Sequence, residues 1–235
     1  AYNQVPNSPN EIHGDALAKE YGFDGALVPG VTVSAYLIHP AVQAWGLDWL
    51  ANGAAHVRVS SPLYDGEQFE VRIEAYTETR YFAELVRPNG RVSATGEVSL
   101  PSHPHAPALR RGDPVMAADY AVPAASFETF DRLQREGCMA LRFPWGGAQE
   151  MSSYLRDEAG MPPLLQSGDG AYANMSFVLG CSNWVLDRNA TMNPWVHLET
   201  RSQNYQPIAA GTAVIAEMTI SDFYEKKGHE FVDVE

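Results

Sequence analysis

The chain is poor in positive charge and in cysteine, and each shortage excludes a class of function. Its 235 residues carry 16 Lys and Arg against 29 Asp and Glu, a formal net charge of −13. Nucleic-acid affinity depends on many Lys and Arg contacts with phosphates, so this balance argues against a nucleic-acid partner. Only Cys138 and Cys181 occur, which is too few for a disulfide scaffold and favours a reducing compartment. We therefore expect a cytoplasmic protein.

The sequence also has no long uninterrupted apolar run. Its most hydrophobic stretch, residues 31–50, is broken by Pro40 and Asp48, whereas a transmembrane helix needs about 20 largely apolar residues in succession. No signal-peptide pattern is recognisable either. These observations predict a protein without a membrane partner.

Metal and nucleotide motifs are missing as well. The 7 histidines show no metal-ligand spacing, and neither HExxH nor CxxC occurs. The GxGxxG loop, the Walker loop and the GxSxG elbow are equally absent. We expect no metal and no cofactor.

What the chain does contain is a histidine turn that precedes a long apolar helix. Residues 10–15 form a polar turn with His13 at its centre, and a glycine-rich segment, residues 22–30, leads into the helix. The first backbone N–H groups of that helix belong to Gly30 and Val31, and a helix start attracts negative charge. If His13 folds back towards Gly30, a general acid/base group faces a site that can stabilise an oxyanion.

Two further features of this region are expected from local sequence. Residues 11–21 fit a short helix with Asp15 as its N-cap. Pro40 lies inside the long apolar helix and should kink it or end its regular part, because proline has no N–H to donate.

The pattern then changes to that of antiparallel strands. Apolar and charged residues alternate from Phe69 to Glu74, which indicates a sheet with one solvent-facing side. Asn89 and Gly90 mark a hairpin turn. The strands expected in this half are residues 55–59, 69–75, 81–86 and 91–100.

The chain divides into two lobes and a connecting segment. Residues 1–100 form the N-terminal lobe, and a Pro- and Ala-rich linker covers residues 101–126. Residues 127–235 form the C-terminal lobe, which begins with a helix over residues 127–136.

The second lobe is a weak copy of the first. The spacing from Gly160 to Gly168 repeats that from Gly22 to Gly30 at an offset of 138, which places a second long helix at residues 171–186. Residues 207–211 repeat residues 62–66 at an offset of 145, so about seven residues would be inserted between this helix and its strands.

The copy lacks the acid/base group of the first lobe. At an offset of 138, His13 corresponds to Met151 and Asn10 to Ala148. We therefore expect one active site per chain, with the second lobe supplying its wall.

Three spaced motifs carry a family resemblance. Asn10-x-Ile12-His13-x-Asp15, the segment from Gly22 to Gly30, and the later run from Ser61 to Glu67 resemble the MaoC-like (R)-specific enoyl-CoA hydratases and dehydratases. The resemblance covers about the first 100 residues. It implies an α+β double hotdog, in which two long helices are each wrapped by an antiparallel sheet and the two sheets form one continuous sheet.

The chain departs from this family pattern at two positions. Ser8 stands where the family usually has an aspartate that orients and deprotonates water, and Pro29 stands where it usually has a histidine. A serine hydroxyl can hold water but is not an anion near neutral pH. A replacement carboxylate could come from Asp15, Asp24 or Asp169, of which Asp15 fits helix capping better.

The resemblance assigns roles to the candidate residues. His13 would be the catalytic acid/base, with Ser8 and Asn10 holding the water. Gly30 and Val31 would bind the substrate carbonyl oxygen through their N–H groups. Tyr36 on the same helix and Asp169 at the start of the second helix complete the expected substrate-binding set.

The function expected from this pattern is that of a hydro-lyase. It would act at the β-carbon of an acyl thioester or a related activated carbonyl, with a CoA or carrier-protein thioester as substrate and a homodimer as a possible assembly. Two alternatives stay open: a hotdog thioesterase, and a non-catalytic acyl-binding protein or partner subunit.

Overall fold

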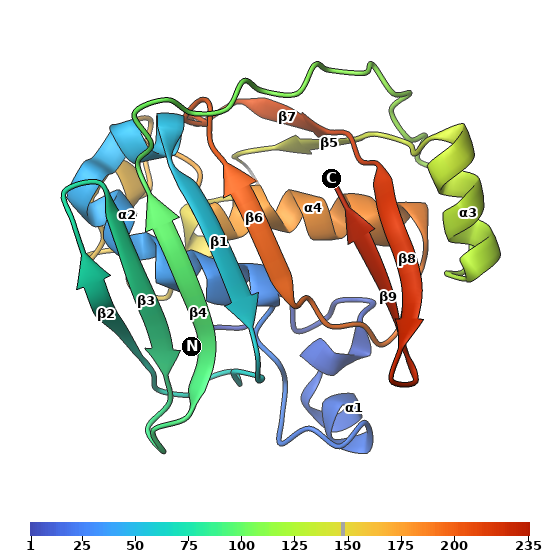
Figure 1. Cartoon of the computed structure of the whole chain (residues 1–235), viewed down its shortest axis with the longest axis horizontal. Helices are drawn as coiled ribbons and strands as arrows, with labels where there is room; N and C mark the ends of the chain where they lie inside the picture. The colour runs from blue at the N-terminus through green and yellow to red at the C-terminus, as the bar shows by residue number, and fades with distance from the viewer. Residues whose placement is uncertain (147–148) are drawn as a thin grey trace.

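The N-terminal lobe consists of one long helix packed against a sheet (Figure 1). The computed structural model describes residues 1–146 and 149–235. Helix α2 is buried along most of its length, with Leu37 and Trp49 fully enclosed. The elements of this lobe are η1 (Glu11–His13), α1 (Asp15–Glu20), α2 (Gly30–Asn52), β1 (Ala54–Val59), β2 (Glu70–Tyr76), β3 (Arg80–Val86) and β4 (Val92–Ser99).

The C-terminal lobe repeats this plan with shorter elements. Its long helix, α4, packs against α2, and Phe177 of α4 belongs to the same hydrophobic core as Leu37. Residues 101–126, which connect the lobes, contain no helix or strand in the structure. The elements of the second lobe are α3 (Phe127–Glu136), β5 (Leu141–Pro144), η2 (Met151–Ser153), η3 (Pro163–Leu165), α4 (Met175–Asn189), β6 (Glu199–Gln203), β7 (Ala213–Ala216), β8 (Ile220–Lys226) and β9 (His229–Val234).

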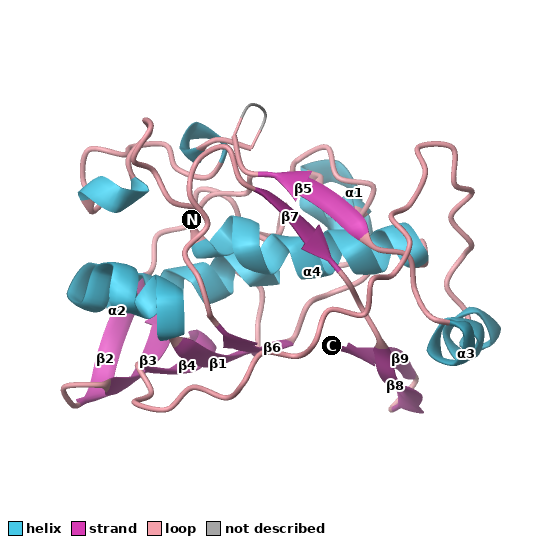
Figure 2. Cartoon of the chain, turned by 90° about the horizontal axis from the view of Figure 1, so that it is seen from above, coloured by secondary structure: helices cyan, strands magenta, loops and turns pink. Residues whose placement is uncertain are grey.

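One antiparallel sheet crosses from the first lobe into the second. Its strand order is β2-β3-β4-β1-β6, and the lobes meet where β1 pairs with β6, with His56 opposite Arg201. Helices α2 and α4 lie on the same face of this sheet (Figure 2). Pairing across the boundary covers a strand edge that would otherwise expose its N–H and C=O groups.

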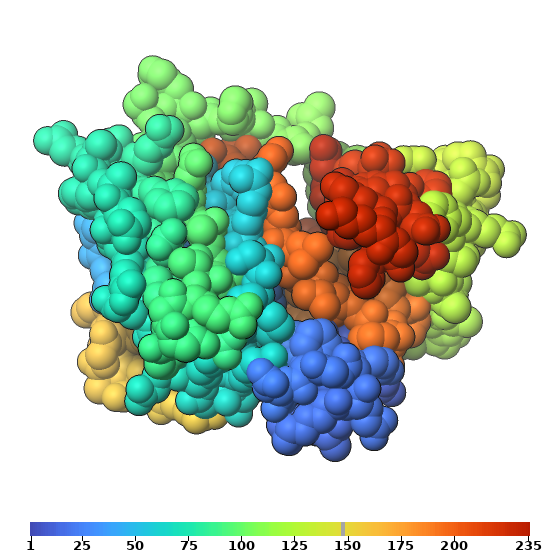
Figure 3. Space-filling model, turned by 60° about the horizontal axis from the view of Figure 1, so that its bottom comes forward, coloured from blue at the N-terminus to red at the C-terminus, as the bar shows by residue number. Residues whose placement is uncertain are grey.

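The single continuous sheet expected from the resemblance is interrupted within the second lobe. Strands β5 and β7 form one two-stranded sheet and β8 and β9 form another. In the first lobe the returning strand β4 pairs with β1, whereas the returning strand of the second lobe, β9, pairs with β8 and not with β6 among the described residues. Figure 3 shows a hollow at this place, beside the β8–β9 hairpin.

Helix α2 continues past Pro40, so of the two expected outcomes, a kink or an end of the regular part, the second does not occur. The Tyr81 hydroxyl donates to the Leu37 carbonyl at 2.7 Å and accepts from the Ala41 N–H at 3.2 Å, so it satisfies backbone groups next to the proline. The irregularity lies at Gly46 instead, with φ 54° and ψ −129°. Only glycine adopts such a conformation without strain.

The short helix also differs from the expected one. Residues 11–21 divide into a 3₁₀ turn, η1, and the helix α1, with Gly14 as the cap of α1. Asp15 is the first residue of α1 and pairs with Lys19 at 2.7 Å. Its carboxylate therefore serves the exposed face of this helix.

The internal repeat is more exact than the sequence indicated. The hydrogen bond from the Val28 N–H to the Leu63 carbonyl has its counterpart from Ala173 to Ile208, at an offset of 145 for both partners. The same offset relates α2 to α4 at their first residues, Gly30 and Met175. The insertion of about seven residues in the second lobe therefore precedes its long helix instead of following it. The offset of 138 was wrong for this helix.

This correction changes which residue corresponds to His13. In the first lobe the Leu27 N–H donates to the Ile12 carbonyl, and in the second the Tyr172 N–H donates to Leu164. Leu165, buried in the core, thus takes the place of His13. Met151 does not, and Ala148 lies outside the described residues. The second lobe still has no acid/base group at this position.

Candidate active site

A cavity of about 350 Å³ lies where the two lobes meet. The N-terminal segment forms one wall, the start of α2 another, and one face of α4 a third. The residues that line it are Gln4, Val5, Pro6, Asn7, Ser8, Pro9, Asn10, His13, Pro29, Val31, Gly180, Asn183, Trp184, Asp187 and Trp195. Three of the expected site residues, Ser8, Asn10 and His13, are therefore brought together with Val31.

His13 is held in one orientation and one tautomer. Its Nδ1 lies 2.8 Å from the Leu27 carbonyl oxygen, which can only accept, so Nδ1 carries the proton and Nε2 keeps a lone pair. The side chain of Asn3 donates to the His13 carbonyl at 2.8 Å and fixes the backbone. Burial lowers the pKa of His13, and the Leu27 contact opposes this only in part. The imidazole is consequently a neutral base near neutral pH.

The start of α2 supplies hydrogen-bond donors beside this base. The N–H groups of Thr32 and Val33 both donate to the Pro29 carbonyl. Across residues 1–146 and 149–235, no acceptor meets the N–H groups of Gly30 and Val31. Gly30 and His13 also line a smaller adjoining cavity. Two free N–H groups at a helix start can stabilise a developing negative charge.

Gly30 also has a packing reason to be glycine. A Cβ atom at this position would lie 2.8 Å from both the Cβ and the carbonyl oxygen of His197. The chain of the second lobe therefore approaches the start of α2 more closely than any side chain would allow.

Asn10 proves to be a positioning residue. Its Nδ2 donates to the Trp195 carbonyl at 2.8 Å, and its Oδ1 accepts from the Trp195 N–H at 3.3 Å. The amide thus clamps a segment of the second lobe over the site and does not hold the water expected of it. The Ser8 hydroxyl accepts from the Asn10 N–H at 3.2 Å and keeps its own proton available to the cavity.

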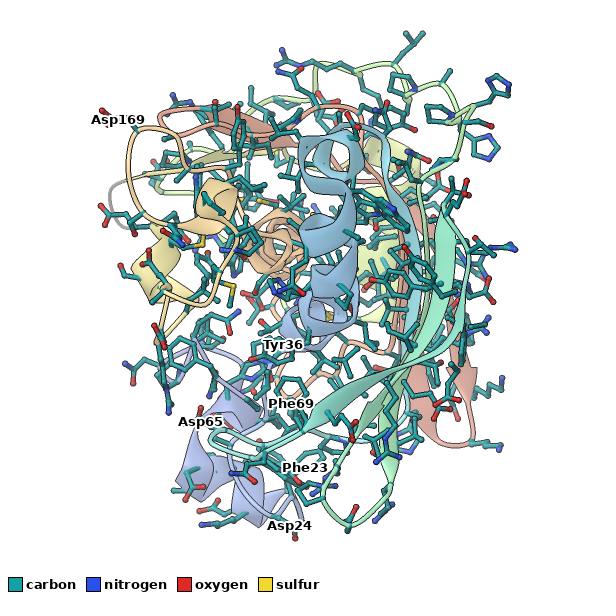
Figure 4. All side chains as sticks on the ribbon, turned by 90° about the vertical axis from the view of Figure 1, so that its left-hand side faces the viewer. Phe23, Asp24, Tyr36, Asp65, Phe69 and Asp169 are labelled. Atoms are coloured by element: carbon teal, nitrogen blue, oxygen red, sulfur yellow. The ribbon has the colours of Figure 1, made fainter. Side chains whose placement is uncertain are left out.

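The structure does not bring Tyr36 or Asp169 to this cavity. The Tyr36 hydroxyl accepts from the Tyr2 N–H, and its ring stacks on Phe69 at 4.6 Å between ring centroids. Asp169 is exposed, and in Figure 4 it projects at a loop far from Tyr36. Neither residue is among those lining the cavity, so its lining gives no support to their expected role in substrate binding.

The carboxylate at this site is Asp187 of α4, which sequence reasoning missed. Asp15 and Asp24, the other expected replacements, are exposed and do not line the cavity. At the offset of 145, Asp187 corresponds to Val42, which is buried in α2. With the correct offset, the sequence shows an acidic residue in the second lobe where the first lobe has a valine in its helix. The offset of 138 aligned other residues, so this difference was not recognised.

Three polar atoms in this cavity are buried without a partner. Among the described residues, the buried side-chain atoms that lack a hydrogen bond are Gln4 Oε1, Asp187 Oδ1 and Trp195 Nε1, and all three residues line the cavity. Buried polar groups are almost always paired in folded proteins. Three residues around one cavity therefore each carry a buried polar atom that the described chain leaves without a partner.

A second histidine, the half-buried His197, supports the wall of the site. His197 Nδ1 lies 2.9 Å from Asn183 Oδ1, and its Nε2 lies 2.5 Å from the Thr200 hydroxyl. Burial lowers the pKa of His197 to about 4. The neutral ring donates to Asn183 and accepts from Thr200, so it joins α4 to β6 behind Gly30.

Comparison with solved structures identifies the architecture. A Chloroflexus aurantiacus protein named as a MaoC-domain dehydratase matches 98% of this chain and 78% of its own, with a TM-score of 0.55 and 13% identity. A Mycobacterium tuberculosis protein described as having a double hotdog fold matches 98% of this chain and 81% of its own, with a TM-score of 0.53 and 13% identity. The fold is a double hotdog. Identity at this level speaks for the fold alone, so the activity must be argued from the site.

Comparisons of the sequence itself give no match. No protein-family model and no curated protein sequence matches the chain. Among the helices of the described residues, none is long and apolar enough to cross a membrane. No group of three or more His, Cys, Asp or Glu side chains within the described ranges could hold a metal ion.

Proposed function

We propose that the protein is a hydro-lyase of the MaoC-like hydratase/dehydratase type. It adds water to, or removes it from, the β-carbon of an acyl thioester carried on CoA or a carrier protein. One observation carries the proposal: a neutral His13, held through Nδ1, lines both the cavity that Val31 lines and the smaller adjoining cavity that Gly30 lines, beside the two free N–H groups at the start of α2. A base next to an oxyanion site is the equipment that this reaction needs.

The chemistry follows from the arrangement of these groups. His13 Nε2 takes a proton from water, and the water oxygen forms a bond to the β-carbon. The electron pair of the carbon–carbon double bond moves towards the thioester carbonyl, whose oxygen becomes negative. The N–H groups of Gly30 and Val31 stabilise that oxygen, and the helix start adds its partial positive charge.

The surroundings of the cavity suit a thioester of this kind. Ser8 can hold the attacking water through its hydroxyl. Trp184 and Trp195 give the cavity an apolar wall, and exclusion of water strengthens the interactions of the oxyanion. Asn10 keeps the Trp195 segment in place over the site.

Incubation with crotonyl-CoA and longer enoyl-CoA substrates tests the proposal. Loss of the enoyl absorbance in the wild type, and its retention in His13→Ala, is the result expected of a hydratase. Release of free thiol instead would point to a thioesterase, and the absence of both reactions would point to an acyl-binding protein. Either of these two outcomes would overturn the proposed function.

A further inference from the structure

The site lacks the carboxylate that would complete an acid/base pair in the N-terminal segment, where Ser8 stands. Water addition requires a second proton transfer, because the α-carbon must gain a proton after the β-carbon gains its hydroxyl. His13 can return the water proton to the α-carbon only if its Nε2 reaches both the water and that carbon. A second proton-bearing group on another wall of the cavity removes this requirement.

Asp187 is the group whose placement answers this need. Among the described residues lining the cavity it carries the one carboxylate, and it lies on the wall formed by α4, whereas His13 lies in the N-terminal segment. Its Oδ1 is buried and has no hydrogen-bond partner. No ion pair involves it within the part of the chain that the structure describes, although Arg188 follows it directly.

A structural role for this aspartate finds no support in its contacts. The side chain is only partly exposed, and its Oδ1 is shielded from water without a hydrogen-bond partner. A carboxylate oxygen placed in this way costs free energy. The equivalent position of the first lobe is the buried Val42, so the internal repeat does not require a carboxylate here. Unpaired titratable groups in a cavity are typical of groups kept for chemistry.

We propose that Asp187, supplied by the second lobe, is the catalytic acid/base that serves the α-carbon in this site. The assignment rests on the proposed hydro-lyase function. In hydration, the Asp187 carboxyl donates its proton to the α-carbon as the enolate electron pair forms the new C–H bond. Its carboxylate then regains the proton that His13 took from water, so each turnover consumes one water molecule and leaves both groups as they began.

The environment of the two groups fits this division of roles. Burial raises the pKa of Asp187, with Arg188 opposing the shift, while burial lowers the pKa of His13. The carboxyl group is thereby made a better proton carrier near neutral pH and the imidazole a better base. In dehydration the same groups act in reverse, Asp187 removing the α-proton and the His13 imidazolium protonating the leaving hydroxyl.

The two roles can be separated with 3-hydroxybutyryl-CoA in deuterium oxide. Exchange of the α-hydrogen, followed by NMR, reports the Asp187 step, and formation of the enoyl absorbance reports the whole reaction. We expect Asp187→Asn to lower the rate of α-hydrogen exchange and the rate of dehydration by at least about 100-fold each. His13→Ala should lose dehydration but keep the exchange, and Asp187→Glu, which retains the carboxyl group, should recover part of both activities.

Asp119→Asn is the matched control, since it makes the same chemical change on an exposed aspartate of the linker, outside the cavity. Circular dichroism and the melting temperature show that each variant is folded. Activity of Asp187→Asn within about 3-fold of an active wild type would overturn the assignment and leave the hydro-lyase function standing. Exchange that survives in Asp187→Asn but not in His13→Ala would also overturn it. A wild type that dehydrates nothing would overturn the proposed function, and this assignment with it.

Discussion

The Nδ1 of His13 lies 2.8 Å from the carbonyl oxygen of Leu27, so Nδ1 carries the proton and Nε2 is the basic nitrogen of the imidazole. Leu27 is also held at its N–H, which donates to the Ile12 carbonyl next to the histidine. The turn and the segment before α2 are thereby joined at two points. This pairing fixes the base relative to the start of the helix.

Removal of this base should abolish activity. We expect His13→Ala to lower kcat/KM on an enoyl thioester by at least about 100-fold, the contribution typical of a general acid/base group. His103→Ala, at an exposed histidine of the linker, is the control and should retain wild-type kinetics. Full activity of His13→Ala would show that the histidine is structural.

The pH profile should report the lowered pKa of His13. Because the neutral imidazole is the active form and burial lowers its pKa from 6.5, kcat/KM should stay high as the pH falls to that value. Activity should decline only below it. A half-maximal point above pH 6.5 in steady-state kinetics would contradict this assignment of the base.

A side chain at Gly30 should impair both packing and chemistry. The Cβ of Gly30→Ala would meet His197 at 2.8 Å, so the second-lobe segment must move away from the N–H groups of α2. We expect kcat to fall at least about 10-fold and the melting temperature to drop. Gly160→Ala, with nothing within 4 Å of its Cβ, should change neither quantity.

Restoring the family carboxylate should lower the activity of this protein. Ser8→Asp would place a second negative charge in a cavity that already contains Asp187. The added charge should raise the pKa of His13 and, in the same way, that of Asp187. Steady-state assays near pH 6 should therefore show a lower kcat/KM than wild type. A rise in turnover would mean that the site is a hydratase that simply lacks one acid.

Acid should destabilise the fold partly through His197. Its pKa is lowered to about 4 in the folded chain, so the unfolded chain binds the proton first. The free energy of unfolding should fall as the pH drops from about 6.5 towards 4, by on the order of 2 kcal/mol. Urea unfolding of His197→Gln across this window should show a smaller pH dependence than wild type. Equal slopes would exclude this histidine as the cause.

The Tyr81 hydroxyl should be needed for the proline-containing part of α2. Tyr81→Phe leaves the Leu37 carbonyl and the Ala41 N–H without their partner in the core, which should cost about 1–3 kcal/mol of unfolding free energy. Tyr76→Phe, at a side chain that is 63% exposed, should cost almost nothing in the same urea titration.

The sequence predicted most of the local structure correctly. The alternation after residue 69, the turn at Gly90 and the helix at residues 127–136 all lie where expected. Local sequence succeeds here because strand periodicity and turn glycines depend on neighbouring residues only. It could not show that α2 continues past Pro40, where the Tyr81 hydroxyl bonds the neighbouring backbone groups.

The motifs also selected the first half of the site. His13, Ser8 and the start of α2 do meet in one cavity, because the turn and the helix are close in the chain and their spacing limits how they fold. Tyr36 and Asp169 do not line this cavity. Tyr36 is turned along α2 towards Tyr2 and Phe69, and Asp169 lies exposed in a loop before α4.

Only the tertiary structure decided the second half of the site. Asp187 lies 174 positions after His13 in the sequence, and no spacing rule joins two residues so far apart. The packing of α4 against α2 brings both to one cavity, and burial then sets the pKa of each in opposite directions. A sequence specifies which groups can carry protons, whereas burial in the folded chain determines how readily each one does so.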